Sequence, residues 1–323
     1  MSPKVENLLE KIFAQKIFIH RPPVLVDVGA SGEVHGKFKP IAKYSICIAF
    51  DADDREMHQV VSKDSNDYQK LYVVNSVLSE KDDEQIPFYL TKYPYCSSTL
   101  EPDSENLKHW DRADIFEINN NSTIKATNLT KVMNELEIKS FDWFKTDSQG
   151  TDLRLFKSIG ETLIQKIIVA EFEPGLINSY IGEDKMHSVL SYMDKFNFWI
   201  SDIKVRGFRR LKPYYKDNFF NNIEKTFFSK CLKQSPGWAE LTYINAISEE
   251  EDFSEREFYL SWVFSTILRQ HGHALDIANR GLIKFPNSLF GELAEFSLKK
   301  MKIPWYLLPF YIVKRHLSKR YKS

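Results

Sequence analysis

Two apolar strands that each run into a polar turn constrain this chain more than any other feature of its sequence. The first, Val24–Val28, contains Asp27 and leads into a turn with Gly29 and Gly32, and the second, Ser45–Phe50, leads into Asp51. Glycine after a strand lets the backbone pass close to a ligand, and an acid at the tip of the next strand can bind a ribose diol. Together they predict a site for a nucleoside cofactor.

The glycine spacing indicates which cofactor this is. A dinucleotide turn has the pattern GxGxxG, whereas the glycines here are Gly29, Gly32 and Gly36, with an acid before the first. This departure disfavours NAD and FAD and suits S-adenosylmethionine, which has no pyrophosphate. Asp51 follows Gly29 at the separation of ~20 residues that is typical of acids that bind the ribose. Asp53, three residues before Glu56, is better explained as the cap of a following helix.

The remaining sequence alternates apolar runs with helical patterns, which predicts an α/β fold with a mostly parallel sheet. Apolar spacing predicts helices over 129–136 and 186–193, and a third helix over 151–159 ends at Gly160. Pro40 prevents a long regular helix after the glycine turn. The expected strands are Val24–Val28, Ser45–Phe50, Tyr72–Leu78, Phe141–Thr146, Ile167–Phe172 and Phe198–Val205.

Two regions interrupt this alternation. After a short extended piece at 86–91, a polar segment runs to Asn128, and we expect it to lie outside the sheet, with the insertion 104–126 as its main part. Beyond about residue 250 the pattern is helical, which predicts a domain over 1–250 and a helical extension over 251–323. Within the extension, 258–286 resembles a single tetratricopeptide helix pair. The aromatic and basic end, 303–320, either docks on the protein or makes weak contact with a membrane surface.

Composition narrows the class of protein. The 323 residues hold 44 Lys and Arg and 44 Asp and Glu, so no global charge attracts nucleic acid. Three scattered cysteines indicate free thiols in a reducing compartment, and the N-terminus does not resemble a signal peptide, so we expect a cytoplasmic protein. The histidines show no metal-ligand spacing next to an acid, and we expect no required metal. The oligomeric state is left open.

A second polar cluster follows two later strands. The stretch 141–152 contains Lys145, Asp147 and Asp152, and the stretch 167–173 contains Glu171. In a parallel sheet, residues at the carboxyl ends of strands face the crevice where ligands bind. With this block the chain resembles the FkbM family of S-adenosylmethionine-dependent methyltransferases. The resemblance covers about residues 24–205 and is carried by the segments 26–32, 50–51, 74–75, 97–100, 145–152 and 170–171.

The resemblance implies a Rossmann-like methyltransferase sheet of seven strands, mostly parallel, with helices on both faces, and methyl transfer to a hydroxyl of a sugar, glycan or small molecule. Lys145, Asp147 and Glu171 would then face the acceptor. The residues implied to bind S-adenosylmethionine are Asp27, Gly29, Ala30, Ser31, Gly32, Asp51, Ala52, Asn75, Ser76, Ser98 and Asp147. The second strand ends in Phe-Asp where relatives often have Glu-Pro, and the insertion 104–126 matches no part of the family pattern.

The chemistry leaves several alternatives open. Methyl transfer requires alignment of the reacting atoms and removal of the hydroxyl proton, so Asp147 is a candidate base, or else it orders its loop or the cofactor ammonium. Lys145 pairs either with a neighbouring acid or with an acidic acceptor. Basic and aromatic residues at 206–216 suggest a solvated hairpin, an anionic glycan site or, less readily, nucleic-acid binding. An NAD-dependent dehydrogenase and a non-catalytic interaction protein remain rival functions.

Overall fold

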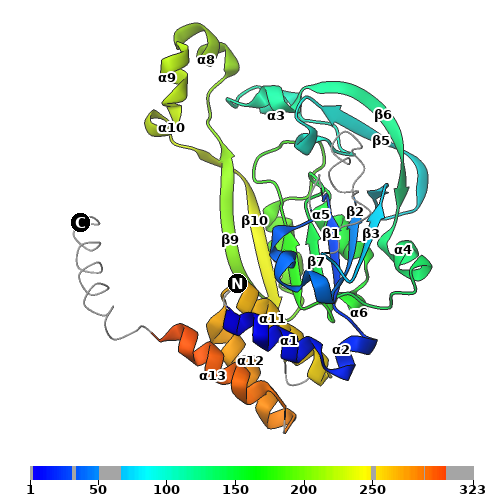
Figure 1. The fold of residues 1–323 in the computed structure, drawn as a ribbon. Coiled ribbons are helices and arrows are strands. Elements are labelled where there is room, and N and C mark those ends of the chain that lie inside the picture. The colour runs from blue at the N-terminus through cyan, green and yellow to red at the C-terminus, as the bar shows by residue number, and fades with distance from the viewer. Residues whose placement is uncertain (1–2, 31–33, 51–66, 249–251, 287, 303–323) are drawn as a thin grey trace, which may run out of the picture. The chain divides into compact units, whose positions relative to one another are not determined.

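The computed structural model describes the whole chain except residues 1–2, 31–33, 51–66, 249–251, 287 and 303–323. It divides into two compact units, one formed by residues 16–251 and the other by residues 1–15 together with 252–323. The larger unit is an α/β structure, and the smaller unit is helical (Figure 1). No helix among the described residues is long and apolar enough to cross a membrane.

The larger unit is built on a seven-stranded mixed sheet in the order β3-β2-β1-β7-β8-β10-β9. The first five of these strands are parallel to one another, whereas β10 is antiparallel to both of its neighbours. This confirms the α/β class and the mostly parallel sheet. The strands are β1 Val24–Val28, β2 Ile46–Phe50, β3 Lys70–Val74, β7 Trp143–Thr146, β8 Val169–Phe172, β9 Phe198–Phe208 and β10 Ser235–Asn245.

One face of this sheet packs against helices that follow the parallel strands. Val26, Phe144 and Ala170 lie in register on neighbouring strands and share a buried cluster with Val132 and Phe156 of the helices. Burial of this apolar face is the main source of the unit's stability. The helices of this face are α4 Leu129–Glu135, α5 Asp152–Ser158, α6 Glu161–Ile164 and α7 Met186–Met193.

The predicted helices are confirmed, and their ends have physical causes. Asn128 caps α4 by accepting a hydrogen bond from the backbone of Lys131. Gly160 ends α5 as predicted, but its φ of 87° and ψ of 143° lie outside the left-handed helical region that the prediction named. Pro40 lies inside η1 (Gly36–Tyr44), a 3₁₀ helix, as expected of a short irregular connection. The edge of the Phe38 ring in η1 packs against Trp143 on the second face of the sheet.

The polar excursion forms a separate three-stranded sheet in the order β4-β6-β5. The predicted strand 72–78 is wrong in its extent, because the chain leaves the main sheet after Val74 and β4 pairs with β6 instead. The polar segment around Asn120 is itself a strand, since it pairs with β5 along most of its length. These elements are β4 Val77–Leu78, β5 Asp83–Thr91, η3 Pro94–Cys96, α3 Ser104–Leu107, η4 Ala113–Phe116 and β6 Ile118–Thr127.

Strand β10 was absent from the sequence-based expectation. The ladder between β9 and β10 accommodates Pro236 and Gly237 at a register shift between Pro236 and Trp238. Beyond this end of β9 and β10, the chain forms three short helices (Figure 1). They are α8 Pro213–Phe219, α9 Asn222–Thr226 and α10 Phe228–Cys231, and a further short helix, α2, spans Lys16–His20.

The smaller unit consists of α1 Pro3–Phe13, α11 Glu255–Ile267, α12 His271–Lys284 and α13 Phe290–Met301. Lys11 of α1 forms an ion pair of 2.7 Å with Glu292 of α13, so the N-terminal helix belongs to the same unit as the C-terminal helices. Helices α12 and α13 pack closely because Gly281 lies against the ring of Phe290, where an added Cβ would be 2.8 Å from ring atoms.

Candidate functional site

The tips of three parallel strands meet where the sheet order reverses, with β2 on one side of β1 and β7 on the other. Gly29 follows β1 with a φ of 77°, and a Cβ added there would lie 2.1 Å from the carbonyl oxygen of Asp147. Only glycine fits this contact without displacing the backbone. The N–H groups of Gly29 and Ala30 both donate to the carbonyl of Phe50, at 3.0 and 3.1 Å.

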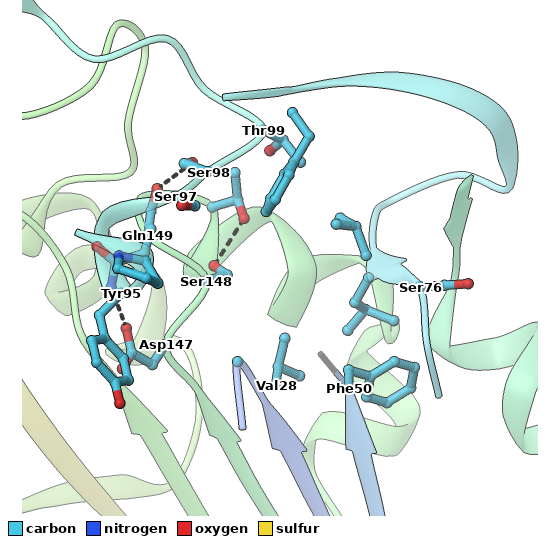
Figure 2. Close-up of a pocket in the computed structure, with 16 residues that line it drawn as sticks. Val28, Phe50, Ser76, Tyr95, Ser97, Ser98, Thr99, Asp147, Ser148 and Gln149 are labelled. Carbon is cyan, nitrogen blue, oxygen red and sulfur yellow. Dashed lines mark hydrogen bonds between the residues drawn. The ribbon is translucent and has the colours of Figure 1, made fainter. Parts of the chain in front are cut away.

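A first cavity, with an empty volume of about 670 Å³, opens above these tips (Figure 2). One part is apolar and includes Val28 and Phe50, whereas Asp147, Gln149 and Ser98 gather on the other side. Its lining residues are Val28, Gly29, Phe50, Ser76, Val77, Leu78, Phe88, Pro94, Tyr95, Ser97, Ser98, Thr99, Asp147, Ser148, Gln149 and Thr151. Four residues expected to bind cofactor, Gly29, Ser76, Ser98 and Asp147, are thus brought together.

The loop after β7 holds Asp147 in place. Gln149 has a positive φ of 55°, and its side-chain amide donates to Asp147 Oδ1 at 2.6 Å. Ser98 Oγ in turn donates to the Gln149 carbonyl at 2.7 Å, so the excursion and the β7 loop are joined at the cavity. A left-handed residue that is not glycine costs free energy, and these contacts offset that cost.

Asp152 anchors the other end of this loop. Its Oδ1 accepts hydrogen bonds from the Ser148 backbone at 2.9 Å and the Thr146 hydroxyl at 3.2 Å, and its Oδ2 accepts from the Glu173 backbone at 2.6 Å. Burial raises the pKa of Asp152 to about 6. Asp152 belongs to the 145–152 block selected from the sequence, but only these hydrogen bonds show that it holds the loop in place.

A second cavity, with an empty volume of about 910 Å³, shares Tyr95, Asp147 and Gln149 with the first. Arg112 and Phe116 bring the previously unassigned insertion into its wall. The lining residues are Tyr93, Tyr95, Cys96, Arg112, Ile115, Phe116, Asp147, Gln149, Gly150, Glu173, Gly175, Ser179, Tyr180, Glu183, Phe208 and Trp238.

Glu171, expected to face the acceptor, lines neither cavity, and neither do Lys145 and Asp27. Register explains this placement, because Asp27 pairs with Lys145 and Lys145 with Glu171 across β1, β7 and β8. Side chains aligned in this way project from the same face of the sheet. Lys145 Nζ lies 3.0 Å from Asp27 Oδ1. Burial lowers the pKa of Lys145, but the charges of Asp27 and Asp147 outweigh it and raise the pKa overall.

Glu171 is satisfied by partners on this second face. Trp143 Nε1 donates to it at 2.7 Å, the Thr242 hydroxyl donates at 3.1 Å, and Lys37 forms a close ion pair. His35 Nε2 lies 3.3 Å from the same carboxylate. Burial by itself would raise the pKa of Glu171, but His35 and Lys37 outweigh it and lower the pKa to about 2. These contacts give Glu171 a structural role.

The other predicted cofactor residues divide into two groups. Asn75 is exposed after β3, and Ala30 is buried at the strand tips, and neither lines the first cavity. The remaining four, Ser31, Gly32, Asp51 and Ala52, lie outside the described residues.

In the described part of the chain, no group of three or more His, Cys, Asp or Glu side chains could hold a metal ion.

Glu173, which the sequence-based expectation did not select, lines the second cavity. It follows the end of β8, and its carboxyl group makes no hydrogen bond or ion pair with any described residue. The signal in the sequence was only a second acid two residues after Glu171, and nothing in the pattern distinguished the two.

The basic segment after β9 is largely held by contacts within the protein. Arg209 forms an ion pair with Asp111 at 3.3 Å, and the Arg210 guanidinium lies over the Trp110 ring at 4.9 Å. Arg206 pairs with Glu240 at 3.1 Å. These contacts give the basic residues structural partners in the insertion and in β10.

Comparison of the chain with family models, with curated proteins and with solved structures found no match.

Proposed function

We propose that this chain is an S-adenosylmethionine-dependent methyltransferase that methylates a hydroxyl of a sugar, glycan or other small molecule. The observation that carries the proposal is the first cavity, which lies at the point where the strand order reverses and is bounded by Gly29 and Asp147. Ligands of open α/β sheets bind at this point.

The strand order favours this function over a dehydrogenase. A dinucleotide-binding sheet has the order 3-2-1-4-5-6, whereas here the antiparallel β10 lies between β8 and β9. A pyrophosphate also needs free N–H groups at the glycine turn. The N–H groups of Gly29 and Ala30 already donate to the Phe50 carbonyl. The seven-stranded, mostly parallel sheet agrees with the methyltransferase resemblance.

The lining of the first cavity fits S-adenosylmethionine at both ends. Phe50, Val77 and Leu78 offer an apolar surface for the adenine ring, and Asp147 offers a carboxylate for the ammonium group. Ser76 adds a hydroxyl group on the side of Phe50, and Ser98 adds one on the side of Asp147 (Figure 2). When bound, the cofactor supplies an electrophilic methyl group, whose bond to sulfur breaks as the acceptor oxygen binds it, with the electron pair staying on sulfur.

The protein's own contribution is alignment and removal of a proton. Gln149 fixes the Asp147 carboxylate by a hydrogen bond of 2.6 Å, and this preorganises the junction of the two cavities. The hydroxyl proton of the acceptor must leave as the oxygen–carbon bond forms, and a nearby carboxylate of the protein can accept it.

Isothermal titration calorimetry with S-adenosylhomocysteine and with NAD tests the proposal. We expect S-adenosylhomocysteine to bind and NAD not to bind. Asp51→Ala should weaken binding of S-adenosylhomocysteine, and Asp53→Ala, assigned to a helix cap, is the matched control. Binding of NAD alone would indicate a dehydrogenase, and binding of neither compound would favour an interaction protein.

A further inference from the structure

We infer that the second cavity binds the methyl acceptor and that Glu173 receives the acceptor's hydroxyl proton. This inference rests on the proposed function, because it places the methyl donor in the first cavity. The two cavities meet at Tyr95, Asp147 and Gln149, so a donor in one and an acceptor in the other come together beside Asp147.

Of the three carboxyl groups that line the second cavity, two already have partners. Asp147 accepts a hydrogen bond of 2.6 Å from Gln149. Glu183 forms an ion pair with Lys185 and accepts a hydrogen bond of 2.7 Å from the Ser179 backbone. Glu173 has no such partner among the described residues. A carboxyl group held in a cavity without a partner is suited to exchange a proton with a ligand.

The surroundings of Glu173 increase its affinity for a proton. Burial, together with the charges of Asp147, Asp152 and Glu240, raises its pKa to about 9. Lys145 lowers it, but by less. The charge of Asp147 already acts on Glu173, so a sulfonium cation bound beside Asp147 would act in the opposite direction and lower this pKa. Glu173 would therefore lose its proton when the donor binds and be ready to accept one from the acceptor.

The walls of the cavity indicate the kind of acceptor. Tyr93, Tyr95 and Trp238 supply aromatic faces, on which a ring-shaped molecule can pack. Arg112 and Gln149 add groups that hydrogen bond hydroxyls. This combination of aromatic and hydrogen-bonding groups suits a hydroxylated ring compound of sugar size. In the reaction the acceptor oxygen gains the methyl group, and its proton passes to Glu173.

Proton-linked calorimetry tests this inference without knowledge of the acceptor. Binding of S-adenosylmethionine at pH 8 is measured in two buffers of different ionisation enthalpy, which gives the number of protons released. We expect wild type to release about 0.5–1 proton more per site than Glu173→Gln, because the sulfonium lowers the Glu173 pKa. With S-adenosylhomocysteine, which lacks the sulfonium charge, this difference should be much smaller.

Two further variants serve as controls. Glu173→Asp keeps a carboxyl group and should retain the proton release, and Glu240→Gln removes a nearby acid outside the cavity and should also retain it. Circular dichroism checks that each variant folds. If Glu173→Gln or Glu173→Asp does not fold, the test uses the other variant and the difference in proton release of wild type between S-adenosylmethionine and S-adenosylhomocysteine. Equal proton release by wild type and Glu173→Gln would overturn the inference while leaving the function intact. If neither ligand binds wild type, the proposed function itself fails.

Discussion

Glu171 and Glu173 are two residues apart, yet their surroundings differ in almost every physical respect. Glu171 lies in β8 with donors on three sides, and its pKa is lowered to about 2. Glu173 follows the strand without a partner among the described residues, and its pKa is raised to about 9. The comparison teaches that a carboxyl group at a strand end stabilises the fold or serves the cavity according to its partners, whatever its position along the chain.

The largest effect is expected at Gly29, where the sheet touches the cavity loop. Gly29→Ala would place a Cβ 2.1 Å from the Asp147 carbonyl at a φ of 77°. We expect a loss of about 4 kcal/mol of unfolding free energy and loss of S-adenosylhomocysteine binding. Urea unfolding and calorimetry measure both.

Gly36→Ala is the matched control for this substitution. A Cβ there meets nothing within 4 Å, so stability and binding should change little. Equal effects of the two substitutions would contradict the assigned contact between Gly29 and Asp147.

Glu171→Gln and Glu173→Gln compare the two acids directly. Glu171→Gln leaves Lys37 without its charge partner and should cost about 3 kcal/mol, because breaking a buried ion pair is strongly destabilising. Glu173→Gln removes an unpaired carboxyl group and should leave stability at pH 7 equal or higher. Thermal and urea unfolding of both variants measure the difference. A larger loss for Glu173→Gln would reverse the roles assigned here.

The pH dependence of stability should have opposite signs for the two acids. The lowered pKa of Glu171 contributes stability above its unfolded pKa of about 4.5, and this is lost as pH falls toward about 2. The raised pKa of Glu173 contributes stability below about 4.5, and this is lost as pH rises through about 9. Glu173→Gln should therefore flatten the decline between these values, as denaturant titrations across pH 5–9 would show. An unchanged slope would contradict the assigned environment.

A smaller effect is expected where the excursion joins the cavity loop. Ser98→Ala removes the hydroxyl that donates to the Gln149 carbonyl at 2.7 Å and should cost about 1 kcal/mol. Binding of S-adenosylhomocysteine should weaken only modestly, because Gln149 keeps its contact with Asp147. Ser201→Ala, at a partly buried hydroxyl on β9 that lines neither cavity, is the comparison substitution. A greater loss of affinity there than at Ser98 would argue against the assigned cavity.

Chelation should have the smallest effect. If Glu173 accepts a proton and does not bind a divalent cation, EDTA should leave ligand affinity and proton release unchanged. Calorimetry of the protein before and after dialysis against EDTA measures this. A decrease in affinity that Mg²⁺ restores would make Glu173 a candidate ligand and break the comparison with Glu171.

The α/β class, the core strands and the helices α4, α5 and α7 were predictable from the sequence. Apolar periodicity and a glycine at the end of a helix are local signals. Gly29 and Asp147 were selected because they follow apolar strands, Ser76 and Ser98 because of the family resemblance, and the structure gathers all four around one cavity. The sequence-based prediction missed β10, which accommodates Pro236 and Gly237 at a register shift against β9.

The different surroundings of Glu171 and Glu173 come from tertiary contacts. Asp27, Lys145 and Glu171 form one row because strands far apart in the sequence pair in register. Glu173 lines the second cavity because β8 ends before it, and residues of the insertion supply part of that cavity's wall. Partners that come from distant segments set burial and charge, and these in turn set what a side chain does. No local pattern of residues contains that information.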